Sequence, residues 1–238
     1  MKYLLIIPAR GGSKGIINKN IIEINGTHLI SYTIISSLAA QKELKDCEVI
    51  VSTDSSKIKE ISLSYGANVP FLRNRSISGD LSPSSEYINH AINYFENINK
   101  IIENIVILQP TSPLRTKDDI ISAINLFEKN NGETLISGYI ENYFNDKGTY
   151  TLKGEYGKPN NIFHSAGTRR QDNDAVVVRN GAIYIFKVAY FKKEKKIISD
   201  NPLIYLMKKN KSINIDTYDD LYLAEKMIQI LLDKDDKL

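Results

Sequence analysis

The alternation of apolar strand-like runs with amphipathic helices constrains the fold most strongly. Residues 3–8 and 105–108 are continuous apolar runs, as expected for strands buried on both faces of a sheet. Residues 29–41 and 84–99 carry apolar side chains at helical spacing. This rhythm predicts an α/β fold with a mostly parallel, doubly wound sheet flanked by helices. Ligands bind to such sheets at the carboxyl ends of the strands.

The remaining elements follow the same rhythm up to one interruption. The pattern predicts further strands at 48–52, 69–72, 182–186 and 213–216, and further helices at 58–65, 118–130 and about 218–232. Between about 138 and 180 the chain is polar and glycine-containing, which predicts hairpins and loops. We interpret residues 1–238 as one domain that carries an insertion at about 138–180.

Composition excludes several classes of protein. The 238 residues are 42% hydrophobic and 25% charged, as in globular proteins, and no apolar run approaches the roughly 20 residues of a membrane span. The first apolar run is too short for a secretory signal. A single cysteine excludes an intrachain disulfide and a thiolate metal cage. The net charge of +3 is low for a nucleic-acid binder. We therefore expect a cytoplasmic protein that binds neither membrane nor nucleic acid.

A glycine-rich, basic loop follows the first strand. Glycines expose backbone N–H groups, Ser13 adds a hydroxyl, and Arg10, Lys14 and Lys19 add three cations. This combination suits a polyphosphate. The loop matches neither the Walker A pattern nor the G-x-G-x-x-G dinucleotide fingerprint. The alternative is a surface turn with solvated lysines, but three cations beside three glycines at a strand end favour the phosphate site.

Two further segments reach strand ends. Gln109 begins a turn that two prolines stiffen, which predicts either a presented polar group or simply a rigid connection. Asp216 ends the predicted strand at 213–216, where its carboxylate could hold Mg²⁺ against phosphates. Asp216 or Thr217 could equally be a helix N-cap, with Asp219 or Asp220 completing the capping pattern.

These segments together resemble the CMP-sialic acid synthetase family, the cytidylyltransferases that activate nine-carbon sugar acids. The resemblance runs in family order along nearly the whole chain, through IPARGGSKG at 7–15, KN at 19–20, STDS at 52–55, LQPTSPLR at 108–115, NGAIY at 180–184, ID at 215–216 and DL at 220–221. It implies a Rossmann-like nucleotidyltransferase fold and a homodimer in which the small insertion reaches the partner's active site. The implied reaction is transfer of CMP from CTP to the anomeric hydroxyl of a 2-keto sugar acid, with release of pyrophosphate.

The resemblance also assigns roles to individual residues. Those implied to be catalytic are Lys14, Lys19 and Asp216, with Asp216 also the ligand of the Mg²⁺ cofactor. Those implied to bind the nucleotide are Arg10, Gly11, Gly12, Ser13, Lys14, Asn20, Ser82 and Ser84. Those implied to bind the sugar acid are Gln109, Arg170 and Tyr184. The expected partners are therefore CTP, a nine-carbon sugar acid and a second copy of the chain.

The chain departs from the family pattern at two positions. Many relatives have Asp-Ile-Asp where this chain has Asn214, Ile215 and Asp216, which favours one metal ion rather than two. Relatives often have Arg-Pro-Asn-Gly, whereas here Arg179 directly precedes Asn180, so no role is carried over to Arg179. Alternatives to a sialic- or legionaminic-type substrate are pseudaminic acid, 3-deoxy-manno-octulosonate, or a nucleotide-binding homologue without turnover.

Overall fold

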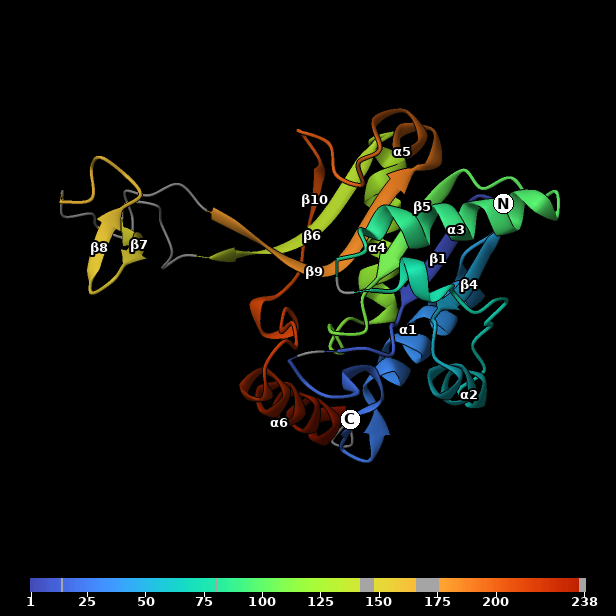
Figure 1. Ribbon diagram of the computed structural model, residues 1–238, viewed down its shortest axis with the longest axis horizontal. Helices are drawn as coiled ribbons and strands as arrows, with labels where there is room; N and C mark the ends of the chain where they lie inside the picture. The colour runs from blue at the N-terminus through green and yellow to red at the C-terminus, as the bar shows by residue number, and fades with distance from the viewer. Residues whose placement is uncertain (14, 80, 142–147, 166–175, 236–238) are drawn as a thin grey trace.

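The computed structural model describes residues 1–13, 15–79, 81–141, 148–165 and 176–235, with side chains up to residue 231. In this part of the chain, a six-stranded sheet has the order β10-β6-β9-β5-β1-β4 (Figure 1). Its strands are β1 (Tyr3–Pro8), β4 (Cys47–Ser52), β5 (Asn104–Leu108), β6 (Thr134–Glu141), β9 (Val176–Lys187) and β10 (Leu203–Leu206). Only β9 runs antiparallel to its neighbours among these strands. The predicted mostly parallel α/β fold is confirmed.

Helices cover both faces of the sheet, which explains why β1 is continuously apolar. Leu5 and Ile7 pack on one face with α1 (Leu29–Glu43), α2 (Ser56–Ser64) and α4 (Lys117–Lys129). Leu4 and Ile6 pack on the other face with α3 (Ser84–Asn97) and α5 (Val188–Glu194). A third apolar cluster seats α6 (Tyr218–Asp235) against Ile16 and Ile215. The loop after β1 is therefore packed against the last helix.

Two predicted strands do not form. Residues 69–72 make a single isolated bridge, Thr53 with Leu72, and the neighbouring Asn68 bridges Ile50, so no continuous ladder develops beside β4. Residues 213–216 lie across the strand ends instead of joining the sheet, and the Ile215 amide donates to the Thr111 carbonyl at 2.8 Å. The sequence pattern also missed β6, β10 and α5, together with the small hairpin of β2 (Glu23–Ile24) and β3 (Thr27–His28).

Regular structure extends into both ends of the predicted insertion. β6 pairs with β9 from Thr134 opposite Phe186 to Glu141 opposite Val176, with a break in register after Ile136. Farther out, β7 (Tyr150–Lys153) and β8 (Tyr156–Pro159) form a hairpin that stands away from the sheet (Figure 1). None of the described helices combines the length and apolar character needed to cross a membrane.

Candidate active site

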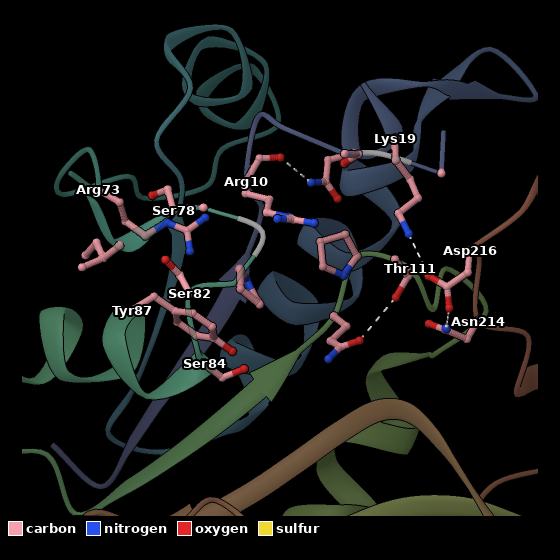
Figure 2. Close-up of a pocket in the computed structure, with 18 residues that line it drawn as sticks. Arg10, Lys19, Arg73, Ser78, Ser82, Ser84, Tyr87, Thr111, Asn214 and Asp216 are labelled. Atoms are coloured by element: carbon pink, nitrogen blue, oxygen red, sulfur yellow. Dashed lines mark hydrogen bonds and ion pairs between the residues drawn. The ribbon is translucent and has the colours of Figure 1, made fainter. Parts of the chain in front are cut away.

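A cavity of about 460 Å³ opens at the carboxyl ends of β1 and β5. Four segments line it, which are the loop after β1, the stretch leading into α3, the turn after β5 and residues 214–216. The lining residues are Pro8, Arg10, Ser13, Gly15, Lys19, Asn20, Arg73, Ile77, Ser78, Gly79, Ser82, Ser84, Tyr87, Gln109, Pro110, Thr111, Asn214 and Asp216. Segments far apart in the sequence thus meet at the predicted edge of the sheet (Figure 2).

Close packing shapes the glycine-rich loop that follows β1, called the glycine loop from here on. The Gly11 amide donates to Asp54 Oδ1 at 2.9 Å, and Asn20 Nδ2 donates to the Arg10 carbonyl at 2.9 Å. A β-carbon on Gly15 would lie 2.7 Å from the Asp216 carbonyl oxygen, so only glycine allows this approach. These contacts fix the loop with Arg10 and Ser13 on the cavity.

Lys19 and Asp216, both predicted to be catalytic, lie together at one end of the cavity. Lys19 Nζ donates to Asp216 Oδ1 at 2.9 Å and to the Ile215 carbonyl at 2.8 Å. Asn214 Nδ2 donates to Asp216 Oδ2 at 2.5 Å. The helix cap is made by Thr217 and Asp220, whose side chains each accept a hydrogen bond from the other's amide. The Asp216 carboxylate therefore faces the cavity rather than capping α6.

The two described residues predicted to bind the sugar acid differ in their access to the cavity. Gln109 lines it, whereas Tyr184 is buried in β9 and is not among the lining residues. Both lie close to Gly181, whose φ of +75° is in the left-handed region. A β-carbon there would lie 3.4 Å from Gln109 Oε1, 3.8 Å from Asn214 Oδ1 and 3.9 Å from the Tyr184 hydroxyl. Three polar groups therefore surround the space that this glycine leaves open.

A buried arginine ties the turn after β5 to β9. Arg115 is 2% exposed and donates to the carbonyls of Gln109 at 3.2 Å and Ala182 at 2.8 Å, and to Thr33 Oγ1 at 2.7 Å. Burial lowers the pKa of Arg115 to about 9. The Arg115 side chain therefore fixes the position of Gln109 relative to Ala182 in β9.

Arg73 and Tyr87 are prominent cavity residues that the sequence analysis missed. Arg73 is 7% exposed, and its guanidinium lies 5.5 Å from the centre of the Tyr87 ring. Its Nε and Nη2 have no hydrogen-bond partner among the described residues. Burial lowers the pKa of Arg73 and raises that of Tyr87 to about 12. No motif marks Arg73, and its only sequence signal is its position after the apolar residues 69–72.

Some of the other predicted site residues line the cavity and some do not. Ser82, Ser84 and Asn20 line the cavity. Gly11 lies behind it, and Gly12 is not among the lining residues. Lys14 and Arg170 lie outside the described residues. Figure 2 shows the resulting layout, with Arg73, the serines and Tyr87 at one end, Lys19 and Asp216 at the other, and Arg10 between.

The donor set fits a metal ion that a phosphate substrate shares, not a metal cage made by the protein. The described residues contain no cluster of three or more His, Cys, Asp or Glu side chains able to hold a metal. Asp216 supplies one carboxylate at the cavity, and the buried Asn214 Oδ1 beside it has no hydrogen-bond partner among the described residues. Mg²⁺ commonly uses one or two carboxylates and completes its shell with phosphate oxygens and water.

Comparison with known proteins adds independent evidence. Residues 4–234 match the family model described as cytidylyltransferase. The chain is 32% identical over 230 residues to the pseudaminic acid cytidylyltransferase of Campylobacter jejuni, covering 97% of both chains. It is 31% identical over 235 residues to the CMP-N,N'-diacetyllegionaminic acid synthase of Legionella pneumophila, again covering 97% of both. It is also 31% identical to the N-acylneuraminate cytidylyltransferase of Escherichia coli over 94% of this chain and 51% of that protein.

Solved structures agree on the fold. A CMP:2-keto-3-deoxy-manno-octonic acid synthetase complexed with CTP superposes with a TM-score of 0.69 at 13% identity, over 96% of this chain and 99% of that one. A 4-diphosphocytidyl-2C-methyl-D-erythritol synthase gives a TM-score of 0.64 at 14% identity, over 95% and 98% of the two chains. At these identities the likeness concerns the fold alone.

Proposed function

Because the chain belongs to the cytidylyltransferase family and is a CTP-dependent nucleotidyltransferase, we propose that its cavity transfers CMP from CTP to a nine-carbon 2-keto sugar acid. The anomeric oxygen of the acid forms a bond to the α-phosphorus, the bond to pyrophosphate breaks, and the hydroxyl proton is lost. Relatives named for pseudaminic, diacetyllegionaminic and N-acylneuraminic acids support a substrate of this class.

The observation that carries the proposal is the distribution of charge in one cavity. Three cationic side chains, Arg10, Lys19 and Arg73, line it, and the carboxylate of Asp216 marks one end. A nucleoside triphosphate carries several negative charges in a row, which Arg10, Lys19 and backbone N–H groups neutralise, while Arg73 lies beside the serines that face the base (Figure 2). Charge neutralisation and alignment of the reacting groups account for most of the rate in phosphoryl-group transfer.

The two substrates occupy different parts of the site in this proposal. Arg10, Ser13 and Asn20 bind the triphosphate with Gly11, Gly12 and Lys14 of the same loop, while Ser82 and Ser84 face the base. Gln109 and Tyr184 bind the sugar acid beside Gly181, and Arg170 comes from the insertion. Lys19 and Asp216 lie where the two substrates meet.

Mg²⁺ is the proposed cofactor. Asp216 would hold it together with phosphate oxygens of CTP, and the ion would neutralise the charge of the departing pyrophosphate. The Lys19 ammonium at 2.9 Å holds the Asp216 carboxylate in place, and the Asn214 amide fixes its second oxygen. These two contacts orient the carboxylate towards the cavity.

We also propose a homodimer in which the β7–β8 hairpin reaches the partner. The hairpin and the residues after it expose large apolar side chains, including Leu152 at 76%, Tyr156 at 82% and Ile162 at 84%. Exposed apolar side chains gathered on a projecting element favour a protein–protein contact. Arg170 lies between this hairpin and β9 in the sequence, which suits a role at the partner's site.

A pyrophosphate-release assay across a panel of sugar acids tests the proposed function. The panel contains sialic, legionaminic and pseudaminic acids, with 3-deoxy-manno-octulosonate as the eight-carbon comparison. We expect release from CTP with at least one nine-carbon acid in the presence of Mg²⁺. If none of the acids stimulates pyrophosphate release, the proposal is contradicted. A preference for the octulosonate would change the proposed substrate class to eight-carbon acids.

A further inference from the structure

Asp54 touches two separate parts of the cavity wall although it does not line the cavity itself. It follows β4, and its Oδ1 accepts the Gly11 amide at 2.9 Å in the glycine loop. The same oxygen lies 3.8 Å from Nη2 of Arg73, in the stretch that leads to α3. One carboxylate oxygen thus joins the loop after β1 to Arg73, the cation beside Tyr87 in the stretch that leads to α3.

The backbone beside Asp54 reinforces this link. The Arg73 amide donates to the Thr53 carbonyl at 2.7 Å, next to the isolated bridge between Thr53 and Leu72. A β-carbon on Gly11 would lie 3.1 Å from the Ser55 β-carbon, so the glycine loop is packed tightly against residues 54–55. The Asp54 carboxylate is therefore held between the glycine loop and residues 72–73, both of which pack against residues 53–55.

Arg73 is attracted by the Asp54 carboxylate and repelled by the positive charge of Arg10. The Arg73 side chain is 4% exposed and that of Asp54 is 18% exposed, so water screens this pair weakly. Arg10 lies on the same cavity, and its positive charge opposes that of Arg73. Arg73 Nε and Nη2 lack hydrogen-bond partners among the described residues, so this guanidinium depends on electrostatic contacts for its position.

We propose that Asp54 is a positioning residue for the nucleotide, which fixes the Gly11 peptide and holds Arg73 against the repulsion of Arg10 so that the glycine loop and Arg73 together fit one nucleoside triphosphate. The inference rests on the proposed binding of CTP in this cavity. Asp54 acts through Gly11 and Arg73, because it does not itself reach the cavity.

Two variants separate the two contacts. Asp54→Asn keeps an oxygen that can accept the Gly11 amide but removes the charge that faces Arg73, and Asp54→Ala removes both. We expect Asp54→Asn to raise KM for CTP about tenfold while KM for the sugar acid stays within about twofold. Inhibition by inorganic triphosphate, a probe without a base, should stay within about twofold in Asp54→Asn and weaken about tenfold in Asp54→Ala.

The matched control is Glu60→Gln, which removes one negative charge from the exposed surface of α2 and should change neither KM. A double-mutant cycle adds a readout that a merely structural residue would not give. If Asp54 acts through Arg73, Asp54→Asn should change CTP affinity by less than about twofold in an Arg73→Gln background. Thermal melting of each variant confirms that the fold is retained.

Three outcomes would overturn the proposal. One is a KM for CTP that is unchanged or lowered in Asp54→Asn, as expected if the carboxylate only opposes the binding of an anion. Another is an equal rise in KM for the sugar acid, which would show general loosening of the site. The third is a full Asp54→Asn effect in the Arg73→Gln background. If the wild-type chain shows no turnover at all, the proposed function has failed, and calorimetric titration of CTP alone still decides the role of Asp54.

Discussion

The contact between Lys19 and Asp216 shows that neighbouring residues at this end of the cavity have different roles. The lysine neutralises and orients a carboxylate that would otherwise repel the triphosphate, while Thr217 and Asp220 cap the following helix. Asp216 is left facing the cavity with an exposed side chain. A carboxylate in this position is suited to share a metal ion with a phosphate substrate.

Replacement of Asp216 by asparagine tests this role. We expect Asp216→Asn to raise the Mg²⁺ concentration for half-maximal rate by about tenfold or more, because a neutral oxygen binds the ion more weakly than a carboxylate. The measurement is a Mg²⁺ titration of initial rates at saturating CTP. The control is Asp219→Asn in the exposed first turn of α6, and an identical Mg²⁺ dependence in Asp216→Asn and wild type would rule out Asp216 as a ligand.

The buried hydrogen bonds of Arg115 lead to a prediction about stability. In Arg115→Met the carbonyls of Gln109 and Ala182 lose a buried donor, so we expect the free energy of unfolding to fall by about 2–4 kcal/mol. Urea denaturation measures the change. Lys129→Ala on the exposed end of α4 should stay within about 0.5 kcal/mol of wild type. A loss in Arg115→Met no larger than in this control would show that the three hydrogen bonds contribute little.

At the scale of elements, parallel strands gather distant loops at one edge of the sheet. Buried apolar runs predicted β1, β4 and β5. The glycines after β1 and the prolines after β5 marked the loops at those strand ends, so Arg10, Lys19 and Gln109 could be expected to meet. The same logic failed for residues 213–216. Their apolar alternation serves contacts of Ile213 and Ile215 with α6 rather than a strand ladder.

The rest of the site depends on contacts that sequence patterns do not contain. Arg73 reaches the cavity because isolated bridges hold residues 68 and 72 beside β4, although no regular strand forms there. Its distance from Asp54 is set by tertiary packing alone. β10 and α5 are short, at four and seven residues, so their periodicity is too brief to identify them.

The close approach between the glycine loop and residue 216 gives a prediction at this scale. In Gly15→Ala the new β-carbon meets the Asp216 carbonyl at 2.7 Å, so the loop and residues 214–216 must separate. We expect kcat/KM to fall about 100-fold, because Lys19 and Asp216 lose their alignment. Gly12→Ala, whose β-carbon would meet nothing within 4 Å, should be affected much less in the same assay. Equal losses in the two variants would contradict this steric explanation.

At the scale of the whole molecule, the sheet and the β7–β8 hairpin are separate in space (Figure 1). The hairpin forms a two-stranded sheet of its own, and such hairpins are marginally stable without further packing. A second copy of the chain would provide that packing and would cover the exposed Leu152 and Tyr156. The assembly and the site are therefore linked in the proposed homodimer.

Sedimentation velocity tests this link. We expect Leu152→Ser combined with Tyr156→Ser to shift the protein from dimer towards monomer and to weaken turnover, since the insertion would no longer reach a partner. The matched control is Leu81→Ser, which removes a side chain that is 97% exposed outside the hairpin. A wild-type protein that sediments as a monomer at enzyme concentrations would contradict the dimer proposal.

The central claim, that this cavity joins CMP to a sugar acid, is tested most directly by the mass of the nucleotide product. The wild-type chain is incubated with CTP, Mg²⁺ and the best sugar acid of the panel, and the products are analysed by mass spectrometry. The account predicts one new nucleotide with the mass of CMP plus the acid minus water, together with one pyrophosphate for each CTP consumed. Free CMP with an unchanged acid, or no consumption of CTP, would contradict it.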